Sequence, residues 1–380
     1  MREQRQVGLW TIALTFLRLG VVGFGGPASH IALMQEQLVE RRGWIERDRF
    51  TEALGVTSLI PGPNSSELAI HTGYLMGGQA GALVAGVCFA LPATVLMILL
   101  SMAYFCAGRF SVRADLFAGL QPVVIAVIAF TLWRLRAAVR SGLLAGVAVA
   151  VAILTVLLPA FEPVWLLAAG ALTFGTWRGD TRRATRGEVS TSVALTLPII
   201  LGAVAGAAAL PALAWVFVKT GALLFGGGYV LIPLLQPEAL ARGWLTKTQF
   251  LDGIALGQAT PGPIVTTSAF VGYAVAGVPG AVVATVAIYV PSFVFVMAGT
   301  GPFLRSFRDR PAVSAFTRGV SAAALGAIAG AGVTLGRVGL NTPLKALIGI
   351  VALVALLRRA PIWLVLPAAA GVSILVGVIR

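Results

Sequence analysis

Four helix-breaking clusters interrupt long apolar stretches of this chain, and they constrain its fold more than any other feature. Two lie in the first half, at residues 24–27 (Phe-Gly-Gly-Pro) and 61–63 (Pro-Gly-Pro). Two more lie in the second half, at residues 225–228 (Phe-Gly-Gly-Gly) and 261–263 (Pro-Gly-Pro). Irregular backbone is tolerated inside a membrane only where protein or a water-filled cavity surrounds it. Broken segments at matching positions of two halves are typical of transporter binding sites.

Composition places these breaks in a membrane protein. Of the 380 residues, 58% are hydrophobic and 11% are charged, and the mean hydropathy is +0.92. A soluble domain carries roughly 25% charged residues, so this chain lacks the polar surface to cover a soluble globule. The alternating apolar and polar segments of an outer-membrane barrel are also absent from the sequence. We therefore expect an all-α polytopic membrane protein.

Charge and rare residue types exclude several other classes of protein. The net charge is +14, but the arginines cluster between apolar runs, as the positive-inside rule predicts, so we expect no nucleic-acid partner. The sequence has two histidines and two cysteines, and their spacing suggests no metal site. It also shows no nucleophile–base arrangement and no phosphate-binding Gly-x4-Gly-Lys-Ser/Thr motif. We expect neither an enzyme nor a bound metal or cofactor.

The two halves repeat the same order of glycine, proline and aromatic residues. Gly43 and Trp44 are matched by a Gly-Trp pair two hundred positions later, at residues 243–244, and Pro92 is matched by Pro291. Such self-similarity indicates an internal repeat. We expect an N-terminal repeat over residues 1–178, a polar linker and connecting transmembrane span over 179–210, and a C-terminal repeat over 211–380.

The arginine-rich loops predict that the two repeats have opposite orientations in the membrane. Assigned by the positive-inside rule, the loops at residues 134–140, 305–310 and 358–359 fall on the cytoplasmic side. The first-half counterparts of the last two, at 109–113 and near Glu162, carry fewer arginines. A charge bias that switches sides is the signature of inverted-topology repeats. We expect broken, re-entrant helices to meet near the bilayer midplane, among about nine full spans.

The breaks themselves have the chemistry of an anion site. A helix that begins at a break presents unpaired backbone N–H groups and a partial positive charge. Two such helices begin in each half. The alternative is that the polar side chains beside the breaks only cap their own helices. The residues that we expect to bind substrate at the breaks are Gly25, Gly26, Asn64, Ser65, Ser66, Gly226, Gly227, Gln258, Thr266 and Thr267.

Two cations precede the breaks at equivalent positions of the two halves. Arg18 and Lys219 each lie inside an apolar run, about two helical turns before a break. An ionisable group at depth in a membrane is costly and indicates a functional site. The alternative is that each side chain extends to the membrane interface. Together with four helix N-termini, two cations predict a small, doubly charged oxyanion as substrate.

Three titratable residues beside the breaks are candidates for coupling transport to an ion gradient. Glu67 and His71 lie four residues apart and share a helix face, and His30 follows the first break. Histidine titrates near neutral pH, which suits proton coupling. The alternative is that these residues make local hydrogen bonds, since Thr267, Val271 and Leu231 replace them in the second half.

The sequence resembles the chromate transporter family over nearly its whole length. The resemblance rests on Phe-Leu-Arg-Leu-Gly before the first break, Phe-Gly-Gly-Pro, Arg-Arg-Gly-Trp and Pro-Gly-Pro-Asn in the first half. It also rests on Phe-Gly-Gly-Gly-Tyr and Ala-Thr-Pro-Gly-Pro in the second. The two fused halves match the long-chain form of the family. The resemblance implies a multi-pass secondary transporter in the plasma (inner) membrane that exports chromate against a proton gradient and confers chromate resistance.

Other functions on the same fold stay open from the residues alone. A passive small-anion channel would need no coupling residue, and a sulfate transporter would bind an isosteric dianion. The partners that we expect are chromate or sulfate and membrane lipid, and the sequence is compatible with a homodimer.

Overall fold

The computed structural model describes residues 7–58, 60–106, 111–139, 141–176, 209–225, 227–299 and 311–379. Within these residues the chain is helical and contains no β-strand. Four of the described helices are long and apolar enough to cross a membrane: Asn64–Cys106, Leu116–Leu135, Ile264–Met297 and Val313–Gly339. The chain is therefore an all-α polytopic membrane protein, as its composition predicts. The polar linker, the connecting span, the arginine loops at 109 and 305–310, and Gly226 lie outside the described residues.

The helices of the two halves follow one another in the same order. The first half contains α1 (Leu9–Val22), α2 (Pro27–Met34), the π-helical turn η1 (Gln35–Arg41), α3 (Arg47–Thr57), α4 (Asn64–Cys106), α5 (Ser111–Leu135), α6 (Gly142–Leu157) and α7 (Glu162–Thr176). The second half contains α8 (Ala209–Ala222), α9 (Leu231–Ala241), α10 (Lys247–Ala259), α11 (Thr267–Gly299), α13 (Pro311–Gly339), α14 (Pro343–Leu357) and α15 (Ile362–Ile379).

All four helix breaks predicted from the sequence are present. Helix α2 begins directly after Gly26, whose φ of 79° suits glycine, and α4 begins directly after Pro63. In the second half a 3-10 turn comes between each break and its helix, namely Gly228–Val230 before α9 and Ile264–Thr266 before α11.

Helices α4 and α11 each consist of a short arm and a long arm. The backbone leaves helical geometry at Gly77 and Gly78 in α4, and at the equivalent Ala276 and Gly277 in α11. In α4, Gly73 of the short arm lies against the backbone of Gly81 in the long arm, so closely that a side chain at either position would collide. The predicted division of this region into a short arm and a separate full span is therefore confirmed.

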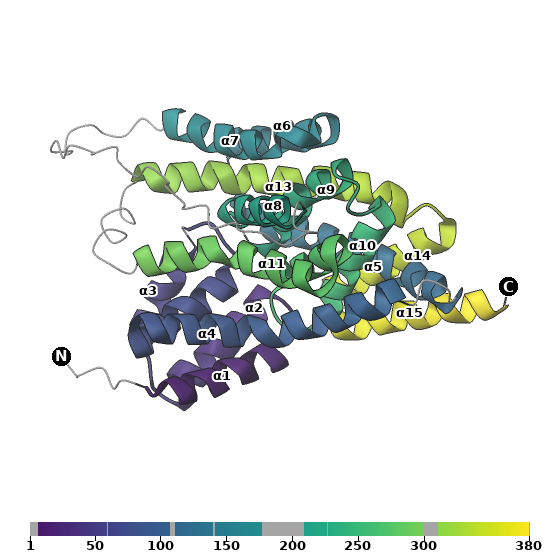
Figure 1. Ribbon diagram of the computed structural model, residues 1–380. Coiled ribbons are helices and arrows are strands. Elements are labelled where there is room, and N and C mark those ends of the chain that lie inside the picture. Colours follow the sequence, from purple (N-terminus) through teal and green to yellow (C-terminus); the bar gives the residue numbers. More distant parts are fainter. Residues whose placement is uncertain are drawn as a thin grey trace.

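Equivalent helices pack in the same way within each half. Helix α1 packs against α4, and α8 packs against α11. Gly20 lies against the backbone of Phe89 in the first half, and Gly221 lies against that of Ile288 in the second. Figure 1 shows that α4 and α11, which contact each other at the centre, cross the molecule in opposite directions. This arrangement agrees with inverted repeats.

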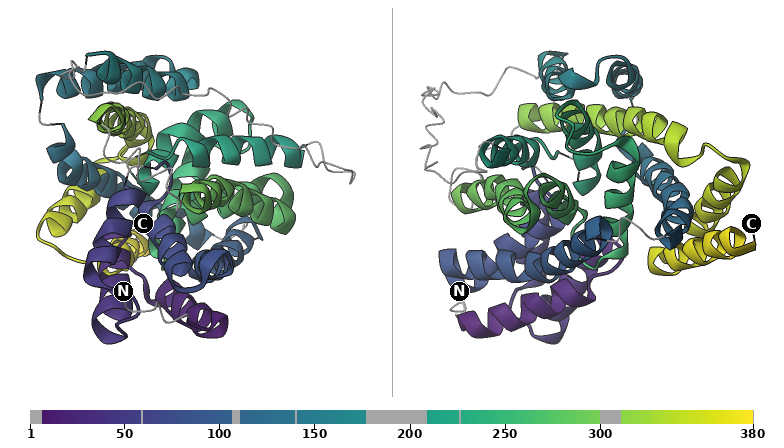
Figure 2. Two further views of the ribbon diagram at one scale, coloured as in Figure 1. Left: turned by 90° about the vertical axis from the view of Figure 1, so that its left-hand side faces the viewer. Right: turned by 45° about the vertical axis from the view of Figure 1, so that its right-hand side comes forward.

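The last helical hairpin of each half packs on the other half. Helices α6 and α7 cover α13, whereas α14 and α15 cover α5. Figure 2 shows these hairpins, in teal and yellow, on separate flanks of the molecule. The contacts are reciprocal, because Gly119 of α5 lies against the backbone of Ala369, and Gly319 of α13 lies against that of Ala169. Each half therefore needs the other to cover its apolar surface.

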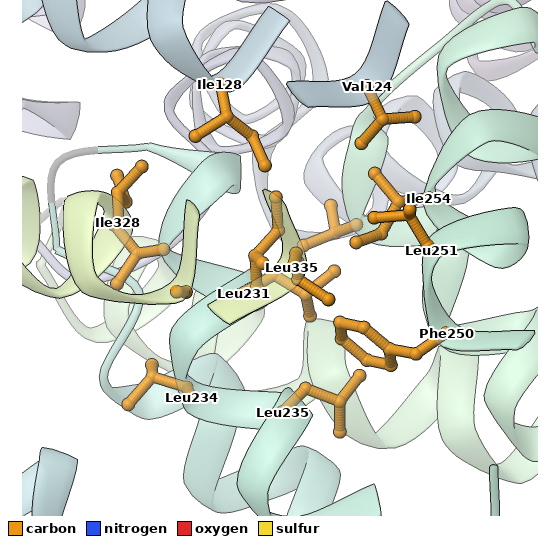
Figure 3. Close-up of a cluster of buried hydrophobic side chains, with 14 of the residues drawn as sticks. Val124, Ile128, Leu231, Leu234, Leu235, Phe250, Leu251, Ile254, Ile328 and Leu335 are labelled. Atoms are coloured by element: carbon orange, nitrogen blue, oxygen red, sulfur yellow. The ribbon is translucent and has the colours of Figure 1, made fainter. Parts of the chain in front are cut away.

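The largest buried cluster lies where both halves meet. Side chains of α5, α9, α10 and α13 interdigitate there (Figure 3). Helix α10 is buried on all sides from Phe250 to Gly257, whereas its first-half counterpart α3 exposes about half of its residues. The two arms that lead into the Pro-Gly-Pro breaks are thus equivalent in sequence position but not in packing.

Candidate functional site

Two backbone hydrogen bonds bring the four breaks together at the centre of the molecule. The N–H of Gly62 donates to the carbonyl of Leu224 at 3.1 Å, and the N–H of Gly262 donates to the carbonyl of Gly23 at 2.7 Å. Each bond joins the Pro-Gly-Pro break of one half to the glycine-rich break of the other. The two bonds are equivalent in the repeat, so they relate the halves by an approximate two-fold axis.

A small cavity lies at one of these two junctions. The volume of this cavity is about 20 Å³. Gly25, Gly26 and Pro27, at the start of α2, form one wall. The opposite walls come from the second half, and the remaining lining residues are Tyr229, Gly257, Gln258, Thr260, Gly262, Ile264 and Ile362. The cavity is therefore shared between the two halves.

The polar groups that line this cavity are uncharged. The first backbone N–H groups of α2 have no partner within the helix, because an α-helix leaves its first turn unpaired. The amide of Gln258 and the hydroxyl of Tyr229 bond to each other at 3.3 Å, and the Thr260 hydroxyl donates to the carbonyl of Gly257. The hydroxyl of Tyr229 also interacts with Thr131 and lies in the field of Arg134 on α5. These groups suit an anion more than a cation.

His30 joins the first break to the start of α4. Its Nε2 lies 2.9 Å from the carbonyl of Gly23, and its Nδ1 lies 3.2 Å from the hydroxyl of Ser65. A carbonyl can only accept, so Nε2 carries a hydrogen, and in the neutral ring Nδ1 accepts from Ser65. The ring is 1% exposed and packs edge-on against Phe89. His30 therefore fixes the geometry of the junction beside the cavity.

At the other junction lies a buried carboxyl group. Glu67 is fully buried, and neither of its oxygens has a hydrogen-bond partner among the described residues. Its Oε1 and the hydroxyl of Ser292 lie on the same side of Gly62, where an added Cβ would collide with both. The hydroxyls of Ser66 and Tyr289 face each other nearby. An ionised carboxylate left unpaired in such a place is costly, so this site favours the protonated acid.

The other polar residues predicted at the breaks lie outside the cavity lining. Thr266 and Thr267 donate to the carbonyls of Pro263 and Ile264, three residues before each of them. Both hydroxyls thus bond back into the turn that precedes them, and neither bond is a helix cap, because a cap accepts from a backbone N–H. Asn64 is half-buried at the start of α4, His71 is buried one turn after Glu67, and Gly227 precedes the 3-10 turn before α9.

The structure does not bring the two predicted cations to the cavity. Arg18 lies on the exposed face of α1, beside the exposed side chains of Leu14 and Val21. Lys219 forms an ion pair with Glu238, which also bonds Arg242 at 3.0 Å. Arg18 is thus exposed on α1, and Lys219 makes a local ion pair. Neither Arg18 nor Lys219 is among the residues that line the cavity, so no described contact supports a role for them in pairing with the substrate.

Sequence reasoning missed several residues that build the two junctions. Tyr229 and Thr260 line the cavity, and Ser292 and Tyr289 face the carboxyl site from α11. Tyr229 and Thr260 belong to the motifs that directly flank the second-half breaks, so adjacency was an available signal. Ser292 and Tyr289 flank the helix-internal Pro291, and their approach to Glu67 depends on the antiparallel packing of α4 and α11. No local sequence pattern predicts that these residues approach Glu67.

Comparison with known proteins assigns a family to this architecture. A family model described as "Chromate transporter" matches residues 10–175 and 211–375. The "Chromate transport protein" of Cupriavidus metallidurans is 33% identical over 91% of this chain and 87% of its own length. The "Probable chromate transport protein" of Synechococcus elongatus is 33% identical over 94% and 93%. The "Chromate transport protein" of Pseudomonas aeruginosa is 31% identical over 85% and 80%. No solved structure matches this chain.

Proposed function

The chain belongs to the chromate transporter family, and we propose that it exports chromate across the inner membrane as a secondary active transporter. The observation that carries this proposal is the cavity shared by the start of α2 and the end of α10. It is small, it lies at the junction of the two repeats, and its polar lining is uncharged and includes groups that can donate hydrogen bonds to a tetrahedral oxyanion.

The cavity can hold an anion without a cation in its wall. The N-terminus of α2 contributes unpaired N–H groups and a partial positive charge. Gln258 and Tyr229 now bond to each other, and both can turn a donor toward an oxyanion instead. Arg134 adds a positive field that reaches Tyr229. Gly25 and Gly26 have no side chains, so the ligand can approach the backbone closely.

The coupling ion in this proposal is a proton carried by Glu67. The carboxyl junction is the repeat-related counterpart of the anion cavity, and the two have diverged in chemistry. One is lined by uncharged donors and the other contains an acid among hydroxyl groups. A proton on Glu67 removes the cost of burying its charge. Loss of that proton to an aqueous phase makes the closed arrangement unfavourable, which gives the gradient a means to drive the cycle.

His30 provides a direct physical connection between the two junctions. It bonds Gly23, whose carbonyl also accepts from Gly262 beside the anion cavity. It also bonds Ser65, which directly precedes Ser66 and Glu67 in α4. A shift of the α4 N-terminus on proton binding therefore acts on the break that forms the cavity wall.

Radiolabelled chromate uptake by everted membrane vesicles tests this function. Vesicles that contain the protein should take up chromate when energised, and an uncoupler should abolish the uptake, because export in the cell corresponds to uptake in everted vesicles. Vesicles from cells without the protein are the control. Uncoupler-resistant flux down the chromate gradient would instead identify a passive channel. Equal transport of sulfate, with sulfate competing as well as unlabelled chromate, would identify a general dianion transporter.

A further inference from the structure

A second buried polar network lies on α10, away from both junctions. Asp252 is 4% exposed, and it accepts hydrogen bonds from the Tyr104 hydroxyl at 2.7 Å and from the Gln121 amide at 2.8 Å. The ammonium of Lys345 donates to the oxygen of the same Gln121 amide at 3.1 Å. Gln121 therefore bridges a buried carboxylate and a cation. The four residues come from α4, α5, α10 and α14, so the network joins both halves.

The position of Lys345 indicates that its charge is stabilised by this network. Lys345 occupies the first turn of α14, where its own backbone N–H is capped by Thr342. A cation in the first turn of a helix is disfavoured by the helix dipole. The bond to Gln121 and the charge of Asp252 offset that penalty. The first-half position equivalent to Asp252 is Glu52, which is exposed on α3, whereas Asp252 is buried.

The network orients the middle of helix α10, where the surrounding contacts are mostly apolar and not directional. Its buried residues Leu251 and Ile254 pack among apolar side chains (Figure 3), and such contacts do not by themselves fix a single register. Hydrogen bonds to a buried carboxylate fix both rotation and position, and polar groups that specify register are the best-attested use of buried charge. Gln258 and Thr260 lie less than three turns beyond Asp252, at the cavity.

We propose that Asp252 is a positioning residue that, through Tyr104, Gln121 and Lys345, holds α10 in the register that presents Gln258 and Thr260 to the substrate. The proposal rests on the cavity being the chromate site. In this view α10 is the fixed wall of that site.

Charge compensation separates this role from a general contribution to stability. Asp252→Asn removes the negative charge that faces Lys345 across Gln121, and Lys345→Met removes the positive charge that faces Asp252, so each should raise the chromate KM by about tenfold with Vmax within about twofold. The double variant removes both charges of the pair and should return the KM to within about threefold of wild type. Glu52→Gln is the matched control and should leave the KM unchanged. Single variants with normal KM and lower folded yield, or a double variant whose effect is the product of the singles, would overturn the proposal.

Hydrogen–deuterium exchange provides a readout that does not depend on chromate. The backbone amides of residues 253–260 should exchange faster in Asp252→Asn than in wild type, and slow again in the double variant. Unchanged exchange in the single variant would overturn the positioning role. If the wild-type protein does not transport chromate but the exchange pattern follows this prediction, the proposed function is wrong, and the role of Asp252 in positioning α10 is supported.

Discussion

In the proposed mechanism, Glu67 is the residue that carries the coupling proton. Glu67→Gln keeps the size of the side chain and its hydrogen-bonding capacity but cannot exchange a proton. We expect this variant to lose gradient-driven chromate uptake and to keep chromate exchange across the membrane. Counterflow in proteoliposomes, measured with and without a pH gradient, checks both parts.

Glu162 supplies a matched control for Glu67. It is also a buried carboxyl group, 2% exposed, but it lies at the start of α7, away from all four breaks. Glu162→Gln should keep gradient-driven uptake. Undiminished gradient-driven uptake in Glu67→Gln would remove Glu67 from the mechanism, and equal loss in both variants would point to a folding defect instead.

Arg18 is the residue for which sequence and structure lead to different expectations. The sequence suggests a cation that pairs with the substrate, and the structure places the side chain on the exposed face of α1. A side chain that extends to the membrane interface contributes little to a site that it does not contact. We therefore expect Arg18→Ala to bind chromate with wild-type affinity in equilibrium dialysis. A well-folded Arg18→Ala protein without measurable chromate binding would restore the role that the sequence suggested.

At the scale of elements, the exchange of hairpins between halves makes a prediction about folding. Helix α13 lacks its cover without α6 and α7, and α5 lacks its cover without α14 and α15. Residues 1–178 expressed alone should therefore aggregate or be degraded, and co-expression with residues 179–380 should restore a complex that copurifies. Pull-down from detergent extracts, followed by size-exclusion chromatography, checks this. A first half that purifies alone as a stable, monodisperse protein would contradict the exchanged arrangement.

The elements that the sequence predicted best are those marked by local chemistry. Gly26, Pro63 and the Gly77–Gly78 pair end or begin helices through their own backbone preferences, so the breaks and arms of the first half are found where the pattern indicates. The hairpin exchange was not predicted, because an apolar helix face does not specify which half covers it. Likewise, the Ser292 contact with the Glu67 region depends on how two distant helices pack.

At the scale of the whole molecule, inversion of the repeats predicts opposite exposure of equivalent turns. Gln79 and Val278 follow the turns within α4 and α11, and both are exposed. With Cys88 and Cys106 replaced by alanine, Gln79→Cys and Val278→Cys should react with a membrane-impermeant maleimide from opposite sides. Right-side-out and everted vesicles give the two sides. Labelling of both positions from one side would exclude inverted repeats.

The central claim is that chromate binds in the cavity between α2 and the end of α10. Equilibrium binding of radiolabelled chromate to the purified protein tests it most directly, with Gln258→Leu as the cavity variant and Thr267→Val as the control. The Thr267 hydroxyl donates to the carbonyl of Ile264 in the adjacent 3-10 turn, so its loss should lower stability by about 1 kcal/mol and leave affinity unchanged. Loss of a hydrogen bond to a charged ligand costs about 1.5–3 kcal/mol, so Gln258→Leu should weaken binding by at least about tenfold. Wild-type chromate affinity in a folded Gln258→Leu protein would contradict the account.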